Sequence, residues 1–208
     1  MRALYLAAVV IAIAGCRRSD DSIRRSDSTV TPPVSIDTSH VAVDTSRNVP
    51  DCGITGTPTI ENDGIGQLKV GRKVDDVRTL CEVVSDAEEM GTEGMKERVL
   101  TVNVGGATVK ALIDRDRVMR IAVSSPGIRT RDSLGVDTPL HTLADMRGAR
   151  FVPGEDGVYG FVADHCGLSF RFAIPMRPPA GRDWTADAAK REHGGASVNR
   201  VLITSCAR

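Results

Sequence analysis

The residues that could carry acid–base or metal chemistry are few and scattered along the chain. Asp164 and His165 are adjacent and could form an acid–base fragment with a serine elsewhere, but a polar turn beside Cys166 is the simpler interpretation. The chain has four histidines: His40, His141, His165 and His193. Their spacing matches no zinc motif, so we expect no metal site from them.

One further stretch resembles a metal-binding loop at its start only. The sequence "DRDRVMRIAVSS" begins at Asp114 like a calcium loop. Its sixth residue is Met119 where such a loop needs Gly, and its twelfth is Ser125 where it needs Glu. We therefore interpret this stretch as a turn between two strands.

Motifs of the common enzyme classes are absent from the sequence. It contains no G-x-S-x-G elbow, P-loop, dinucleotide fingerprint or H-E-x-x-H. We therefore expect no catalytic residue and no cofactor, and favour a non-catalytic protein that binds another protein or acts as a scaffold. The alternative is a hydrolase or small-ligand-binding protein whose site is assembled only by folding. Lys and Arg total 27, as do Asp and Glu, and this balance argues against nucleic acid as a partner.

The first residues have the pattern of an export signal. A single Arg is followed by an apolar run at residues 3–14 and then by Gly15 and Cys16. The run is too short to span a bilayer as a helix but has the length of a signal-peptide core. Cleavage after Ala14 would suit an ordinary signal peptidase, because "AIA" is a small-x-small site.

The stretch "IAGC" at residues 13–16 resembles the lipobox of bacterial lipoproteins. This resemblance implies that residues 1–15 are removed and that Cys16 carries a diacylglyceryl group, with further acylation of its amine. Five cysteines are an awkward number for an exported protein, and assigning Cys16 to lipid leaves an even set of four. Because Arg17 rather than Asp follows Cys16, the resemblance also implies an outer-membrane anchor facing the periplasm.

Residues 16–50 differ in composition from the rest of the chain. They are rich in Ser, Thr, Asp, Arg and Pro, with scattered apolar residues and no helical or strand period. Such a segment cannot bury enough apolar surface to offset its ordering entropy. We expect a disordered, roughly neutral tether between the membrane and a folded part that begins near residue 51.

The folded part contains a repeated apolar pattern. Residues 68–77 ("LKVGRKVDDV") match residues 134–143 ("LGVDTPLHTL") at their apolar positions, and each predicts the start of an amphipathic helix. In the first copy the helical spacing extends to Val84, and in the second Thr138 and Pro139 suit the N-cap and first helical positions.

Three alternating strands follow each predicted helix. The first set is at residues 98–104, 108–113 and 118–123, with a hairpin at Gly105 and Gly106. The second set is at residues 158–163, 168–174 and 198–203. We therefore predict an α+β fold of two tandem units, residues 51–128 and 129–208, each a helix packed on a small antiparallel β-meander.

This order of elements resembles two known families. One is the β-lactamase inhibitor protein, with tandem helix-plus-sheet units; the other is the small-protein-A (outer-membrane-lipoprotein-A) family of assembly lipoproteins, which the stretch "GIGQLKVGRKVDDV" at residues 64–77 resembles at its start. The resemblance implies a binding or envelope-assembly protein.

Four cysteines remain for disulfides, and they allow three pairings. The predicted elements favour Cys52 with Cys81, which ties the entry segment to the end of the first helix. They also favour Cys166 with Cys206, which ties a strand end to the tail after the last strand.

The second predicted unit has a long insertion at residues 175–195. It carries Arg177, Arg182 and Trp184, residue types that are enriched at interface hot spots, and we expect it to bind the partner protein. The alternative is that Trp184 folds back and caps an open sheet edge.

Overall fold

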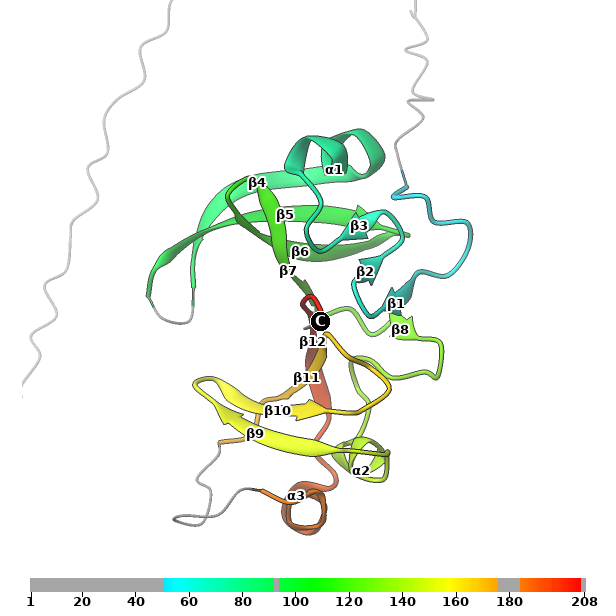
Figure 1. Ribbon diagram of the computed structural model, residues 1–208, viewed down its shortest axis with the longest axis vertical. Helices are drawn as coiled ribbons and strands as arrows, with labels where there is room; N and C mark the ends of the chain where they lie inside the picture. The colour runs from blue at the N-terminus through cyan, green and yellow to red at the C-terminus, as the bar shows by residue number, and fades with distance from the viewer. Residues whose placement is uncertain (1–50, 92–93, 176–183, 207–208) are drawn as a thin grey trace, which may run out of the picture. The chain divides into compact units, whose positions relative to one another are not determined.

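The computed structural model describes residues 51–91, 94–175 and 184–206, all of which lie within one compact unit, Thr45–Arg208. An antiparallel sheet of eight strands, in the order β4-β5-β6-β7-β12-β11-β10-β9, forms its centre (Figure 1). The strands of its first half are β4 (Glu82–Met90), β5 (Lys96–Val104), β6 (Ala107–Asp114) and β7 (Arg117–Val123). Those of its second half are β9 (Arg150–Gly154), β10 (Gly157–Phe161), β11 (Leu168–Phe172) and β12 (Val198–Ile203).

The two halves of this sheet meet where β7 pairs with β12. Ile121 lies opposite Ile203, and Val123 lies opposite Val201. The sequence pattern aligns these same two strands at an offset of 80, so Ile121 corresponds to Val201 and Val123 to Ile203. The pairing is therefore locally two-fold symmetric about the pair Ala122 and Leu202.

A smaller mixed sheet and three short helices complete the described residues. The small sheet has the order β3-β2-β1-β8, in which β1 and β8 are parallel. Its strands are β1 (Thr59–Glu61), β2 (Gly64–Ile65), β3 (Leu68–Lys69) and β8 (Arg129–Thr130). The helices are α1 (Val74–Leu80), α2 (Leu140–Ala144) and α3 (Ala186–His193).

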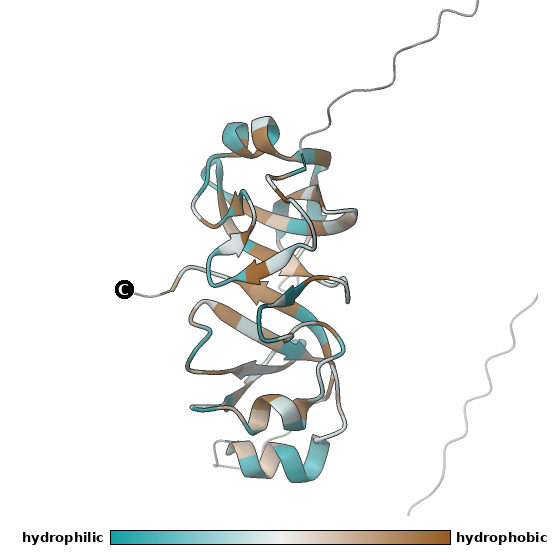
Figure 2. Ribbon diagram, turned by 90° about the vertical axis from the view of Figure 1, so that its right-hand side faces the viewer, coloured by the Kyte–Doolittle hydropathy of each residue, from teal (hydrophilic) through white to brown (hydrophobic). Residues whose placement is uncertain are grey.

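One face of the large sheet is apolar and forms the core. The strands alternate as expected for a half-buried sheet, with hydrophobic and hydrophilic residues in turn (Figure 2). Leu100 of β5 and Phe170 of β11 are fully buried on this inner face. They share a single cluster with Val77 of α1, Ile65 of β2 and Leu143 of α2, so the helices and the small sheet belong to the same core.

The predicted fold class of two tandem helix-plus-sheet units is wrong. The described chain is mostly β, with one continuous large sheet and helices of seven, five and eight residues. The two strand sets are joined through β7 and β12, and their apolar faces are buried in one shared core to which the helices and the small sheet contribute.

Two helix boundaries also differ from expectation. Helix α1 ends at Leu80, and Val84, expected on it, lies in β4 with 57% of its surface exposed. Thr138 is not the N-cap of α2, which is Pro139. The Thr138 hydroxyl instead accepts a hydrogen bond from the Gly135 backbone at 2.9 Å.

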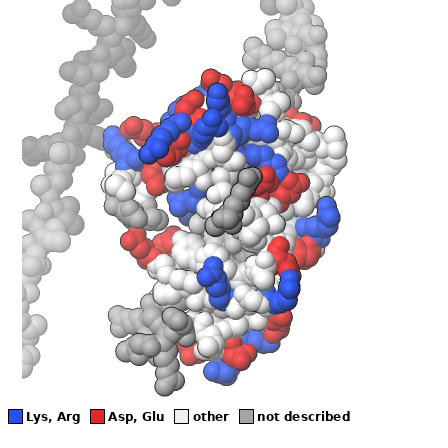
Figure 3. All heavy atoms as spheres, viewed as in Figure 1, with Lys and Arg blue, Asp and Glu red and all other residues white. Residues whose placement is uncertain are grey.

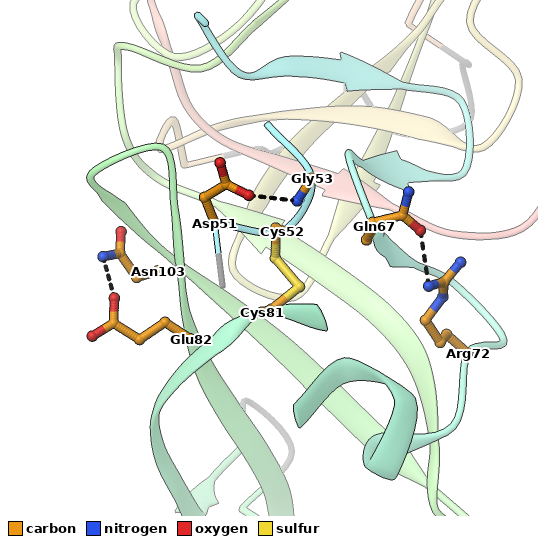
Figure 4. Close-up of a disulfide and its surroundings, with 8 residues drawn as sticks. All are labelled: Asp51, Cys52, Gly53, Gln67, Arg72, Cys81, Glu82 and Asn103. Atoms are coloured by element: carbon orange, nitrogen blue, oxygen red, sulfur yellow. Dashed lines mark hydrogen bonds between the residues drawn. A yellow bond between two sulfur atoms is a disulfide. The ribbon is translucent and has the colours of Figure 1, made fainter. Parts of the chain in front are cut away.

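Both disulfides are present between the pairs that the sequence favoured. Cys52 is bonded to Cys81, where α1 ends and β4 begins (Figure 4). Cys166 is bonded to Cys206, which joins the start of β11 to the tail after β12. On the loop-entropy model, closures of 29 and 40 residues stabilise the fold by roughly 3.5 to 4 kcal/mol each.

Candidate functional site

The outer face of the large sheet, opposite the core, holds a pocket of about 420 Å³. We call it the outer pocket; it is formed by β4, β5, β6, β7 and β12. Its charged lining residues are Glu89, Glu97, Lys110, Arg120 and Arg200. Its volume lies within the range of small-ligand sites.

Ala122 lies on the floor of the outer pocket, between Arg120 and Ser124 along the chain. Lys110 of β6 is its direct cross-strand neighbour, and Arg120 and Ser124 flank it two residues away on its own side of the sheet. Because Ala122 is small, the longer side chains around it leave a hollow above it. Val99 and Leu112, which are 7% and 8% exposed, supply an apolar part of the lining.

The positive charges of the outer pocket are unequally neutralised. Lys110 lies 2.6 Å from Glu89, and Arg120 lies 3.9 Å from Glu97. Among the described residues, Arg200 has no carboxylate within ion-pair distance. The pocket therefore has three cations and two carboxylates, although Lys, Arg, Asp and Glu are intermixed over the surface in Figure 3.

Beside Arg200, on the same face, lies a second polar cluster of Arg171, Asp156 and Tyr159. Arg171 lies directly opposite Arg200 on β11, and its Nε is 2.8 Å from the Asp156 carboxylate. Tyr159 donates a hydrogen bond of 2.5 Å to that carboxylate. Burial would raise the pKa of Asp156, but the hydrogen bond and the charge of Arg171 outweigh it and lower the pKa.

The two edges of the large sheet differ. At the β9 edge, Pro153 lacks a backbone donor and Phe151 forms a β-bridge with Trp184. At the other edge, the nine residues of β4 pair only with β5 among the described strands. Exposed apolar side chains occur on β4 at Val84 and Met90.

The acid–base fragment suggested by the sequence is not assembled. His165 Nε2 contacts Asp132 at 2.9 Å, while Asp164 pairs with Arg147. The Thr130 hydroxyl donates to the other oxygen of Asp132 at 2.6 Å, so this carboxylate ties a loop after β8 to the turn before β11. The pKa of Asp132 is lowered because these hydrogen bonds outweigh the effect of burial.

The structure also shows where the calcium-like stretch lies and whether potential metal ligands are grouped. Asp114 and Arg117 pair across the β6–β7 turn, in agreement with the turn interpretation. Within residues 51–91, 94–175 and 184–206, no three His, Cys, Asp or Glu side chains are grouped as metal ligands would be.

Trp184, which the sequence predicts to be an exposed contact for a partner protein, is buried instead. It is 5% exposed and its ring stacks on His193 at a centroid distance of 5.1 Å. The aromatic side chain is buried because α3, which was expected to be part of a loop, folds beneath it. The alternative of an edge-covering role is the one observed. Arg177 and Arg182 lie outside the described residues, as does Cys16.

The sequence reasoning missed the outer pocket. A signal was present, because Arg120 and Arg200 fall on equivalent positions of the aligned stretches "VMRIAV" and "VNRVLI". It could not be interpreted without knowing that these strands are neighbours in one sheet.

Among the described residues, no helix has the length and apolar character needed to span a bilayer. No family model matches the chain, and no curated relative matches it significantly. A solved structure has the same fold: the uncharacterized protein yfeY from Escherichia coli, with a TM-score of 0.52 and 14% sequence identity. The match covers 70% of this chain and 99% of that one, so the chain is similar in fold to a protein whose description gives no function.

Proposed function

We propose that this protein is a lipid-anchored lipoprotein of the bacterial cell envelope that binds another protein through the open edge of its large sheet. The observation that carries the proposal is the contrast between the blocked β9 edge and the nine-residue edge of β4, to which no other described strand is paired on its outer side. An exposed edge strand offers a row of backbone donors and acceptors to which an extended segment can add as a further strand.

The chemistry of β4 indicates what kind of segment would fit. The strand carries Glu82, Asp86, Glu88 and Glu89 and no basic residue. Val84 and Met90 are 57% and 68% exposed and give such a segment apolar contacts. Asp86, Glu88 and Glu89 already form ion pairs with basic residues of this chain. A partner segment would therefore be held mainly by backbone hydrogen bonds and by apolar contacts with Val84 and Met90.

The envelope location is supported by two independent features. The lipobox-like residues 13–16 predict acylation of Cys16 and an anchor in the outer membrane. The two disulfides are typical of a compartment outside the reducing cytoplasm. Mass spectrometry of the membrane-extracted chain is expected to find a thioether-linked lipid on Cys16; a soluble product that begins at Gly15 would contradict the anchor.

Site-specific photocrosslinking in intact cells tests the binding edge. A photoreactive residue at Val84 and at Met90 should give an adduct with the same envelope protein. The control position is Val152 of β9, which is 42% exposed and lies at the opposite edge of the sheet. Equal adducts at all three positions, or none at either β4 position, would refute the edge as the binding surface.

A further inference from the structure

We propose that the outer pocket binds a small organic anion, with the carboxylate or phosphate group of the ligand above Ala122 and its apolar part against Val99 and Leu112. This inference goes beyond the proposed protein-binding function, because it concerns the outer face of the sheet; of β4, only Glu89 and Met90 line the pocket.

The first argument is the symmetric placement of the two arginines. Arg120 on β7 and Arg200 on β12 are equivalent about the local two-fold axis through the Ala122–Leu202 pair, and both line the outer pocket. They lie on either side of this pair, with Cα atoms about 14 Å apart by strand geometry. Two extended guanidinium groups can therefore approach one anion held above Ala122.

The second argument is the charge left over. Glu89 is engaged by Lys110 and Glu97 by Arg120, whereas Arg200 has no carboxylate partner among the described residues. Arg171 lies directly opposite Arg200 across β11 and β12, and like charges in this position are unfavourable. Asp156 offsets part of this repulsion, but it is held by Arg171. A bound anion would neutralise the remaining charge.

The third argument is the set of hydrogen-bonding and apolar side chains around Ala122. Lys110 and Ser124 lie next to Ala122, so an ammonium group and a hydroxyl group can add hydrogen bonds to an anion held by the arginines. Guanidinium groups match carboxylate and phosphate in geometry. Val99, Leu112 and Met90 line the same pocket and favour an anion that carries an apolar group over an inorganic ion.

Calorimetric titration of the full chain tests this inference with two aromatic anions, benzoate and phenyl phosphate, and with their neutral counterparts benzyl alcohol and phenol. We expect saturable binding of at least one anion and at least tenfold weaker binding of its neutral counterpart. The better of the two anions identifies the group as carboxylate or phosphate.

Variants distinguish the pocket from general surface charge. Arg200→Gln and Arg120→Gln are each expected to weaken binding at least tenfold. Arg115→Gln, which removes an equal charge from an exposed turn, is expected to leave it unchanged. Circular dichroism checks that each variant is folded. The inference is overturned if neither anion binds saturably, if the neutral compounds bind equally well, or if the folded double variant Arg120→Gln/Arg200→Gln keeps the wild-type affinity.

Discussion

Asp156 controls the polar cluster beside the outer pocket, and its ionisation should be visible in stability. Its pKa is lowered in the folded chain, so its carboxylate stabilises the fold above the unfolded pKa of about 3.9, and this contribution is lost as the pH falls through the folded pKa. We expect Asp156→Asn to cost about 1 to 3 kcal/mol at pH 7, as for hydrogen bonds to charged groups.

The difference in the free energy of unfolding between wild type and Asp156→Asn should shrink as the pH falls below about 4 and through the lowered folded pKa, because the wild-type carboxyl then becomes neutral. Urea unfolding at a series of pH values measures it. Tyr159→Phe, which removes one hydrogen bond and keeps the Arg171 pair, is the matched control and should cost less at neutral pH. If the difference in the free energy of unfolding did not change with pH, the ionised Asp156 carboxylate would not be the source of the stabilisation.

Trp184 is expected to be a structural residue. It is 5% exposed, bridges the β9 edge at Phe151 and stacks on His193. Trp184→Ala should therefore lower the free energy of unfolding by about 3 to 5 kcal/mol, as for other buried aromatic truncations. Chemical denaturation measures this, with Trp184→Phe as a variant that keeps an aromatic ring and loses less. A loss within about 1 kcal/mol for the alanine variant would show that the ring is dispensable.

Among the turns, Gly106 and Gly167 form a natural matched pair. Their φ angles are +84° and +79°, so an alanine at either position adopts the same unfavourable backbone conformation. A Cβ at Gly106 would meet nothing within 4 Å, whereas one at Gly167 would lie 2.4 Å from the Asn62 carbonyl oxygen and 2.5 Å from that of Thr204.

We expect Gly106→Ala to cost about 1 to 2 kcal/mol, the left-handed backbone penalty alone. Gly167→Ala should cost several kcal/mol more, because the β1–β2 turn or the tail after β12 must move. Thermal and urea unfolding of both variants give the comparison. Equal losses in the free energy of unfolding for the two variants would mean that the turn before β11 can move to accommodate the Cβ atom at no cost.

The strands that were predictable are those with one buried face. Leu100, Val102 and Val104 of β5 alternate with polar residues, and Phe170 and Phe172 of β11 do the same. Strand β4 could not be predicted, because its sequence "EVVSDAEEM" has no fully buried residue and its pairing depends on backbone bonds to β5. The helical spacing ahead of it was wrongly extended to Val84 for this reason.

The candidate site was less predictable than the strands. The outer pocket combines side chains from five strands, and its arginines are 80 residues apart. The aligned stretches showed that two strands resemble each other. Only the observed pairing of β7 with β12 shows that they are neighbours, since identical alternation fits either separate or shared sheets.

At the scale of the whole folded region, the seam between β7 and β12 should make unfolding cooperative. The seam joins both strand sets through three register pairs, at Ile121, Ala122 and Val123, and one hydrophobic cluster contains residues of both halves. Neither half can unfold without exposing the buried side chains of the other. We therefore expect a single two-state transition, as for most domains of this size.

Two optical probes can test this in one urea titration. Trp184 is the single tryptophan of the chain and lies against β9, so its fluorescence reports on the second half of the sheet. Far-ultraviolet circular dichroism reports on all strands of both halves. With the disulfides intact, the two normalised curves should coincide. Unfolding of the second half of the sheet, β9 to β12, would also remove the strand that pairs with β7. Distinct midpoints, with fluorescence changing before or after the dichroism, would mean that the two halves of the sheet are independent folding units despite their shared seam.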